Sequence, residues 1–179
     1  MRLFSHIVAG IGAGSIASML YGNHYGAFLY IVILSFVINI IIDLGHTRIR
    51  GIVIRSPYTH EVLNSMAISI LIGSIVWIAV GNLYGVSLYA SLLASLLISG
   101  SHLLGDLITR GGIYVRIGAN MLRISLADYS YKDPLTNTIY VAILSLPLII
   151  SLVGIASSPS EIPWYSLVDK LVGIYGTAG

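Results

Sequence analysis

Histidine and carboxylate residues recur near the ends of four apolar stretches of this sequence, where they could bind a metal ion together. The residues concerned are His6, Asp43, His46, His60, His102 and Asp106. His102 and Asp106 are four residues apart, so they would share one face of a helix. Asp43 and His46 are three residues apart, with the same consequence. The chain has no cysteine, which excludes thiolate ligands, disulfides and thiol nucleophiles.

Imidazole and carboxylate groups are the ordinary protein ligands of zinc and related divalent ions. We therefore predict a divalent metal site, with zinc as the expected ion, and both one ion and two ions fit the set. The ligand candidates, in order of preference, are His60, His102, Asp106, Asp43, His46 and His6. A competing interpretation makes them interfacial residues, with the two aspartates capping helices or pairing with arginines. His24, in a turn beside Asn23, is expected to be a solvated loop residue.

The segment from Arg55 to Glu61 predicts a helix start beside an anion site. Ser56 followed by Pro57 is typical of an N-cap and a first helical residue. A helix N-terminus attracts anions through its free N–H groups, and Arg55 adjoins it. A metal beside an anion site suits phosphoester hydrolysis, although Arg55 could instead contact lipid phosphates.

Composition indicates that lipid surrounds most of the chain. Of its 179 residues, 56% are hydrophobic and 9% are charged, and the mean hydropathy is +0.92. Soluble domains carry roughly 25% charged residues. The length suits a single domain over residues 1–179. The net charge of +2 is small, and we expect no nucleic-acid partner.

Five stretches have the length and apolar character of transmembrane helices. They are residues 3–21, 26–43, 61–80, 86–108 and 136–157. The first stretch follows Arg2 as a signal peptide would, but His6 inside it favours a retained span. The fold class expected is therefore an all-α, polytopic membrane protein.

Small residues at helical spacing predict close packing of these helices. Gly10, Gly12 and Gly14 fall in the first span, and Ser91, Ser95 and Ser99 form one face of the fourth. Pro147 is expected to kink the fifth span.

The remaining segments are expected at the membrane surfaces. Residues 109–135 form a charged segment in which apolar and polar residues alternate over Ile113–Ile117 and 122–126. This alternation predicts a short β-hairpin, with an interfacial helix as the alternative. The tail, residues 158–179, carries Trp164 and Tyr165 and is expected to lie as a short helix at the outer interface.

The basic residues indicate the orientation of the chain. With five spans, eight of the nine fall on the side of the N-terminus and only Lys170 falls on the other. These eight are Arg2, Arg48, Arg50, Arg55, Arg110, Arg116, Arg123 and Lys132. Cytoplasmic segments carry such an excess of Lys and Arg, so we expect a multi-pass protein of the cell membrane with a cytoplasmic N-terminus. The candidate ligands then lie at the cytoplasmic boundary.

The ordered set of motifs resembles the YdjM-like family of LexA-regulated, inner-membrane-bound, predicted metal-dependent hydrolases. The matching elements are His6, Asp43 with His46, Arg55 with Thr59 and His60, and His102 with Asp106, Thr109 and Gly112. The resemblance covers roughly residues 1–135 and implies a metal-dependent hydrolase site in which Thr59 contacts the substrate. Glu61 departs from the family, which commonly has serine there, and offers an acid or base instead.

We therefore expect a metal-dependent hydrolase whose site faces the cytoplasmic headgroup layer. Glu61 or Asp43 would be the general base, Arg55 and Thr59 would bind substrate, and residues 112–133 would form a rim or lid. A lipid or another small phosphoester is the expected substrate, and membrane lipids are expected partners. The alternatives are a metal-ion or proton transporter and a non-catalytic membrane scaffold. A transporter normally places its site near the midplane, whereas the middle of the third and fifth spans has no ionisable residue.

The predicted orientation can be tested with reporter fusions placed after Arg110 and after Gly179. With five spans and a cytoplasmic N-terminus, the first reporter should lie in the cytoplasm and the second outside. Two reporters on the same side would contradict the five-span topology.

Overall fold

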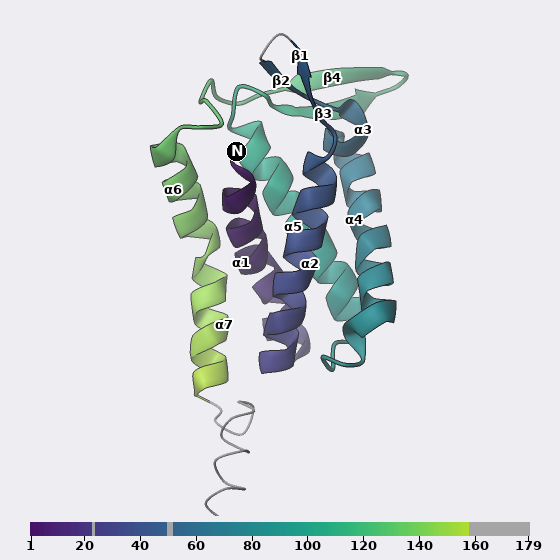
Figure 1. The fold of residues 1–179 in the computed structure, drawn as a ribbon, viewed down its shortest axis with the longest axis vertical. Coiled ribbons are helices and arrows are strands. Elements are labelled where there is room, and N and C mark those ends of the chain that lie inside the picture. Colours follow the sequence, from purple (N-terminus) through teal and green to yellow (C-terminus); the bar gives the residue numbers. More distant parts are fainter. Residues whose placement is uncertain (23, 50–51, 158–179) are drawn as a thin grey trace, which may run out of the picture.

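The computed structural model describes residues 1–22, 24–49 and 52–157 as a bundle of long helices with strands at one end (Figure 1). The long helices are α1 (Leu3–Tyr21), α2 (Tyr25–Asp43), α4 (Val62–Val76) continued by the π-helical turn η1 (Trp77–Gly81), α5 (Leu88–Leu107), α6 (Pro134–Leu144) and α7 (Leu146–Ala156). A one-turn helix, α3 (Pro57–His60), precedes α4. The predicted outer tail, residues 158–179, lies outside the described residues.

Within the described part of the chain, five helical stretches are long and apolar enough to cross a membrane, which confirms the all-α, five-span prediction. Their bounds differ from the predicted ones by at most two residues at each end. The fifth span, Pro134–Ala156, breaks at Ser145 into α6 and α7, with Pro147 in the first turn of α7. The predicted kink is therefore present, because proline cannot donate a helical hydrogen bond.

Small residues bring α1 close to its neighbours, as predicted. α1 packs against α2, α5, α6 and α7. An added Cβ at Gly12 would overlap the Leu144 carbonyl of α6, and one at Gly10 would overlap Ser35 of α2. On the other side of the bundle, the Ser91 hydroxyl of α5 donates to the Gly73 carbonyl of α4 at 2.9 Å. Backbones that approach this closely require a small residue on one partner.

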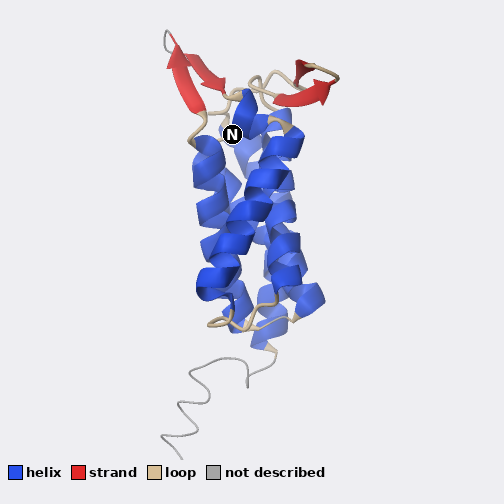
Figure 2. Cartoon of the chain, turned by 90° about the vertical axis from the view of Figure 1, so that its right-hand side faces the viewer, coloured by secondary structure: helices blue, strands red, loops and turns tan. Residues whose placement is uncertain are grey.

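Two antiparallel hairpins lie at the same end of the bundle as the N-terminus (Figures 1 and 2). The predicted hairpin is confirmed by β3 (Ile113–Ile117) and β4 (Asn120–Ile124), with Ile113 opposite Ile124, although the second strand begins and ends two residues earlier than the predicted 122–126. The other hairpin, β1 (His46–Ile49) and β2 (Ile52–Arg55), was not predicted. Its two strands have four residues each, too few for a period-2 pattern to stand out in a charged connection.

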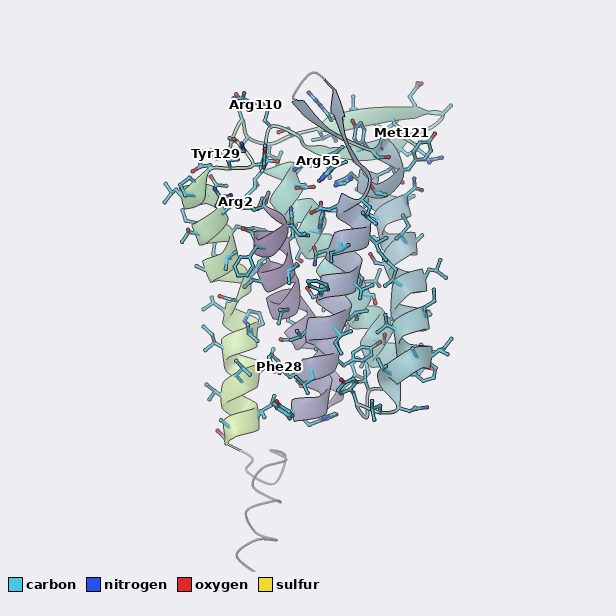
Figure 3. All side chains as sticks on the ribbon, viewed as in Figure 1. Arg2, Phe28, Arg55, Arg110, Met121 and Tyr129 are labelled. Atoms are coloured by element: carbon cyan, nitrogen blue, oxygen red, sulfur yellow. The ribbon has the colours of Figure 1, made fainter. Side chains whose placement is uncertain are left out.

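The charged side chains and the apolar surface are separated along the bundle. Arg2, Arg55 and Arg110 gather at the end with the hairpins, whereas Phe28 lies toward the opposite end (Figure 3). Large apolar side chains such as Ile78 and Leu83 point outward and are more than three-quarters exposed. The interior contains buried serines and Asn39 beside apolar side chains such as Leu34 and Ile98. This distribution is expected where lipid is the surrounding solvent.

Close packing at Gly12 predicts a large effect of a single methyl group. Gly12→Ala should lower the thermal unfolding midpoint in detergent, because overpacking costs about 1–3 kcal/mol and the obstacle is the Leu144 backbone. Gly100→Ala in α5 is the matched control, since an added Cβ there meets nothing within 4 Å. Equal midpoints for the two variants would contradict the described contact between α1 and α6.

Candidate metal centre

The structure gathers all six predicted ligands at the end of the bundle beneath the hairpins. His6 comes from α1, Asp43 from the last turn of α2, His46 from the first residue of β1, His60 from α3, and His102 and Asp106 from α5. Among the described residues, their donor atoms form three groups, and the donor atoms of each group lie within 4.8 Å of one another. The first group is His6, His102 and Asp106, the second is Asp43, His60 and His102, and the third is His46, His60 and Asp106.

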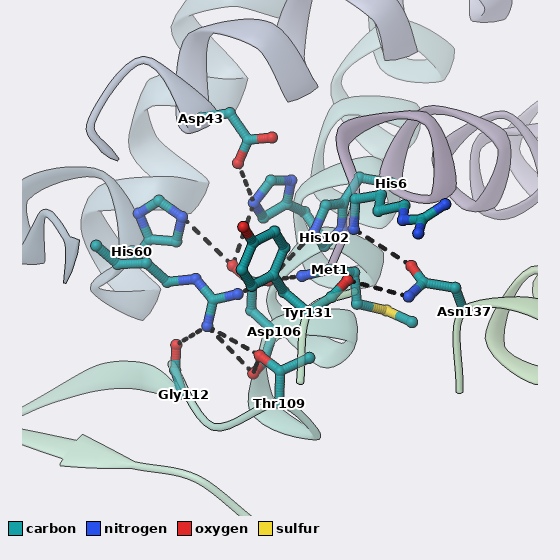
Figure 4. Close-up of polar contacts among 12 residues, drawn as sticks. Met1, His6, Asp43, His60, His102, Asp106, Thr109, Gly112, Tyr131 and Asn137 are labelled. Atoms are coloured by element: carbon teal, nitrogen blue, oxygen red, sulfur yellow. Dashed lines mark hydrogen bonds and ion pairs between the residues drawn. The ribbon is translucent and has the colours of Figure 1, made fainter. Parts of the chain in front are cut away.

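The distances between donor atoms suit metal ligands better than hydrogen bonds. His60 Nε2 lies 3.3 Å and His102 Nε2 lies 3.5 Å from the same oxygen, Asp106 Oδ2 (Figure 4). Asp43 Oδ1 lies 3.4 Å from His102 Nε2. An N–H···O hydrogen bond spans about 2.7–3.2 Å. Ligands held about 2.0–2.2 Å from a tetrahedral ion are about 3.3–3.6 Å apart, so the residues present fit a divalent ion.

Several of these donor atoms are buried without a hydrogen-bond partner. They are both ring nitrogens of His6, Asp43 Oδ1, His46 Nε2, His60 Nε2, His102 Nε2 and Asp106 Oδ2. His6, His60, His102 and Asp106 are at most 1% exposed. An unpaired buried polar atom costs about 1–3 kcal/mol, and native structures contain few of them. So many in one place indicate a site built for a ligand that supplies the missing contacts.

Asn39, which the sequence analysis did not single out, determines which nitrogen of His102 is free. The Asn39 amide group donates to the Ser35 carbonyl at 2.8 Å, so its Oδ1 faces His102 Nδ1, also at 2.8 Å. An amide oxygen only accepts, so His102 Nδ1 carries the proton and Nε2 presents a lone pair to the cluster. Metal-binding histidines commonly have such an outer partner. The sequence did carry one signal for Asn39. It lies four residues after Ser35 in the second span, so the two polar side chains share one face of that helix.

Thr59 positions His60 in the same manner. Its hydroxyl lies 2.9 Å from His60 Nδ1, which leaves Nε2 directed at Asp106. Gly45 faces this hydroxyl, and a Cβ at Gly45 would overlap it. The predicted contact between Thr59 and substrate is therefore replaced by a contact with a candidate ligand, because α3 turns the side chain inward.

Asp106 is held by contacts to one of its two oxygens. Oδ1 accepts from Arg55 Nη2 at 2.5 Å and from the Met1 amino group at 2.9 Å, and His6 Nε2 lies 3.1 Å away. Oδ2 is left facing His60 and His102. An arginine partner fixes the plane of a carboxylate and keeps it charged.

These contacts correct the predicted role of Arg55. Its Nη1 also donates to Thr109 Oγ1 at 3.1 Å and to the Gly112 carbonyl at 2.9 Å, and the residue is 7% exposed. The guanidinium therefore ties β2 to the end of α5 and is occupied by protein acceptors. Substrate binding by Arg55 was expected because Arg55 adjoins a predicted helix start in the sequence. Its contact with Asp106, which is 51 residues away, was not visible there.

The structure places Glu61 in a capping position and brings it into none of the donor groups, so the geometry gives its predicted role as general base no support. Glu61 is the N-cap of α4, and its Oε2 accepts from the Asn64 backbone N–H at 2.9 Å. The chain turns between α3 and α4, so Glu61 belongs to none of the three donor groups although it follows His60 directly. His24 likewise serves as a cap, since its Nδ1 accepts from the Ala27 N–H at the start of α2.

Asp43 and His46 are the more accessible members of the cluster. Their side chains are 15% and 24% exposed, respectively, and lie 3.6 Å apart. Burial, followed by the neighbouring His60 ring, lowers the pKa of His46 to about 4. His46 is then neutral at pH 7, with a lone pair free to bind a metal. The cluster is therefore mostly buried, and Asp43 and His46 form its accessible edge.

The β3–β4 segment lies over the cluster through contacts that are mainly to the backbone. The Leu126 N–H donates to the Leu107 carbonyl at 2.8 Å, and Ser125 Oγ donates to the Thr109 carbonyl at 2.7 Å. The Tyr114 hydroxyl reaches the Arg55 carbonyl at 3.4 Å. These contacts keep the segment over the end of α5, where a lid would lie.

A family model described as "Protein of unknown function (DUF1286)" matches residues 1–105. The chain belongs to this family. The DUF1286 region contains five of the six candidate ligands, and Asp106 is the residue immediately after it. No match was found among curated proteins or solved structures. The description of DUF1286 carries no activity, so the resemblance to YdjM-like hydrolases stays a prediction.

The role of Asn39 can be tested by metal affinity. Asn39→Leu should weaken zinc binding about 10–100-fold, as is typical when an outer partner of a ligand is lost. Asn39→Asp retains an acceptor for His102 and should bind zinc nearly as tightly as the wild type. Competition with a chromophoric chelator in detergent measures both.

Tyr30→Phe is the control for Asn39, since it removes a buried hydroxyl contact to Ser91 away from the cluster. Wild-type zinc affinity in Asn39→Leu would show that this contact does not orient His102.

Proposed function

We propose that this member of the DUF1286 family is a membrane-embedded, metal-dependent hydrolase. The observation that carries the proposal is the convergence of unpaired His and Asp donors from α1, α2, β1, α3 and α5 at one end of the bundle. His6, His46, His60, His102 and Asp106 would hold the ion, which we take to be zinc. Such an ion would lower the pKa of a water molecule and polarise a scissile ester.

Asp43 is the residue we propose as general base. It is partly exposed at the edge of the cluster, and one of its oxygens has no hydrogen-bond partner. A carboxylate in this position could accept a proton from water and release it to solvent. Asp43 Oδ1 lies 3.4 Å from His102 Nε2, so the carboxylate is directed toward the site.

The substrate class follows from the surface beside the accessible edge. Leu44 and Tyr58 flank this edge in the sequence and are about three-quarters exposed. Apolar side chains beside a polar site at a bundle end suit a molecule with an acyl chain and an ester headgroup. We therefore propose a lipid phosphoester that reaches the site from the headgroup layer.

The same end of the bundle is proposed to face the cytoplasm of a multi-pass protein of the cell membrane. Both hairpins, the N-terminus and the arginines at positions 2, 55 and 110 lie there. The helix ends on the opposite side, within the described part of the chain, carry no lysine or arginine. This asymmetry is typical of cytoplasmic surfaces.

Transport is the alternative, and the buried serines of the bundle are the observation that favours it. Ser65 and Ser99 contact each other at 3.0 Å, and Tyr30 contacts Ser91. However, Ser69 and Ser95 donate to carbonyls of their own helices, as packing serines do. A site at the bundle end, without Asp, Glu, His, Lys or Arg along the described parts of α4, α6 and α7, favours a hydrolase over a transporter or a scaffold.

The proposal is tested by hydrolysis with the purified protein in mixed micelles containing zinc. Glycerophospholipids and bis(p-nitrophenyl) phosphate are the substrates, and ester cleavage is measured. Asp43→Asn should lower turnover by about 10²–10⁴-fold while zinc content is unchanged, because a general base contributes a factor of this size. Asp106→Ala should lose both zinc and turnover.

His24→Asn is the matched control, since asparagine also caps helices and position 24 is remote from the cluster. It should retain wild-type turnover. Zinc-dependent flux into proteoliposomes without cleavage of either ester would instead identify a transporter.

A further inference from the structure

The two faces of the β3–β4 hairpin differ in character. Neighbouring residues of a strand point to opposite faces, and directly opposed residues of two paired strands share a face. One face carries Arg116 opposite Met121 and Arg123 opposite Tyr114. The other face carries Asn120 near the turn and five apolar side chains, which are Ile113, Val115, Ile117, Leu122 and Ile124. The hairpin is therefore amphipathic, with one basic face and one apolar face.

The apolar face is uncovered where the hairpin extends away from its base. The exposed fraction is 7% at Ile113, but it is 61% at Ile117 and 52% at Leu122. Figure 1 shows the hairpin lying across the end of the bundle, over α3 and α4, with its turn toward one side. Exposed apolar side chains that line one face of an element mark a surface for a partner.

The basic face has no counter-charge within the described part of the chain. Arg116 and Arg123 are both exposed, and neither has an ion pair with a described residue. The described carboxylates have contacts elsewhere, in the cluster for Asp43 and Asp106, at helix caps for Glu61 and Asp133, and with Arg110 for Asp128. The positive charge of this face is thus left for another molecule.

The position of the hairpin in the chain indicates which molecule that is. It lies between the end of α5 at Leu107 and the start of α6 at Pro134, and both helices belong to membrane spans. These flanks hold the hairpin at the boundary of the membrane, where acyl chains and headgroup phosphates are both within reach. Cationic side chains beside an anionic lipid surface are attracted to it.

The spacing of the two arginines also suits a phosphate group. Arg116 and Arg123 are diagonal neighbours on one face, a relation that places side chains about 7–8 Å apart at their bases. Like charges at this distance repel, and an anion between them removes the repulsion. Guanidinium groups bind phosphate oxygens in a bidentate geometry.

A second copy of this chain fits the hairpin less well. It could pair with β4, which has no further strand beside it in the described sheets. However, β4 carries Arg123, and charged residues on an edge strand discourage such pairing.

We propose that the β3–β4 hairpin is a docking surface for anionic phospholipid, with its apolar face on the acyl chains and Arg116 and Arg123 at the headgroup phosphates. This surface depends neither on the metal centre nor on hydrolysis. It fixes the depth at which the end of the bundle lies in the membrane.

Spin labels on adjacent residues of β4 test the apolar face. The chain has no cysteine, so a single introduced cysteine carries the only label. Leu122→Cys and its matched control Met121→Cys are labelled in nanodiscs of phosphatidylcholine and phosphatidylglycerol, and relaxation by oxygen and by a water-soluble nickel chelate is measured. The label at 122 should respond mainly to oxygen, about 5–10 Å below the phosphates, and the label at 121 mainly to nickel.

Two outcomes of the labelling would overturn the proposal. Equal relaxation by nickel at both positions would place the whole hairpin in water. Spin–spin broadening between labels at 122 would assign this face to a second copy of the chain.

Lipid selectivity tests the basic face. The full chain is delipidated in detergent and given equal amounts of phosphatidylglycerol and phosphatidylcholine, and bound lipids are counted by native mass spectrometry. Arg116→Gln should lower the ratio of bound phosphatidylglycerol to phosphatidylcholine about fivefold, the effect of one arginine near an anionic surface. Arg110→Gln is the matched control, because Arg110 is already paired with Asp128 at 2.6 Å, and its ratio should stay close to that of the wild type.

An unchanged ratio in Arg116→Gln, or an equal loss in both variants, would overturn the anionic-lipid surface. Either failure is distinct from that of the proposed function. Zinc content should be the same in the wild type and both variants, because the hairpin supplies none of the six candidate ligands.

Discussion

A buried carboxylate, Asp106, imposes the main constraint on the end of this bundle that carries the hairpins. A charged side chain at membrane depth is unfavourable unless it has partners, by about 2.5–3.5 kcal/mol on insertion scales. Here Arg55 donates to Oδ1, and His60 and His102 approach Oδ2. Removing one partner of a buried ion pair costs about 3–5 kcal/mol, so β2, which carries Arg55, must dock where it does. The hairpins, α3 and the end of α5 are arranged around this one group.

Close helix packing and the chemistry of the site are linked through α1 and α2. Gly10 leaves space for Ser35 and Asn39 of α2, and the Ser35 hydroxyl donates to the Ile7 carbonyl of α1 at 2.9 Å. Asn39, held in this way, sets the tautomer of His102. A residue larger than glycine at position 10 would therefore disturb His102, a candidate metal ligand, without contacting it. The small residues of membrane helices are usually discussed as packing features, but here they also determine the direction of a ligand lone pair.

Closure of the site distinguishes it from a simple interfacial cluster of polar residues. Histidines at a membrane boundary normally reach water or headgroups, whereas His6, His60 and His102 are buried beneath the β3–β4 segment. The ion that we propose would contact their unpaired nitrogens, whereas snorkelling would not, because these side chains do not reach the surface. In the orientation that we propose, access at Asp43 and His46, beside exposed apolar residues, would connect this buried cluster to the headgroup layer.

The sequence by itself determined the five spans, the β3–β4 hairpin and the set of six candidate ligands. Apolar length, period-2 alternation and the rarity of ionisable residues in apolar stretches are local properties that can be counted along a chain. The tertiary structure alone decided the roles of Arg55, Thr59, Glu61 and Asn39. The role of Arg55 follows from a contact with Asp106, 51 residues away. The role of Asn39 follows from a contact with His102, 63 residues away. Glu61 is adjacent to a ligand yet caps a helix, because the chain turns between α3 and α4. Spacing along one helix predicts which side chains share a face, but only the packing of separate elements determines which atoms of those side chains remain free.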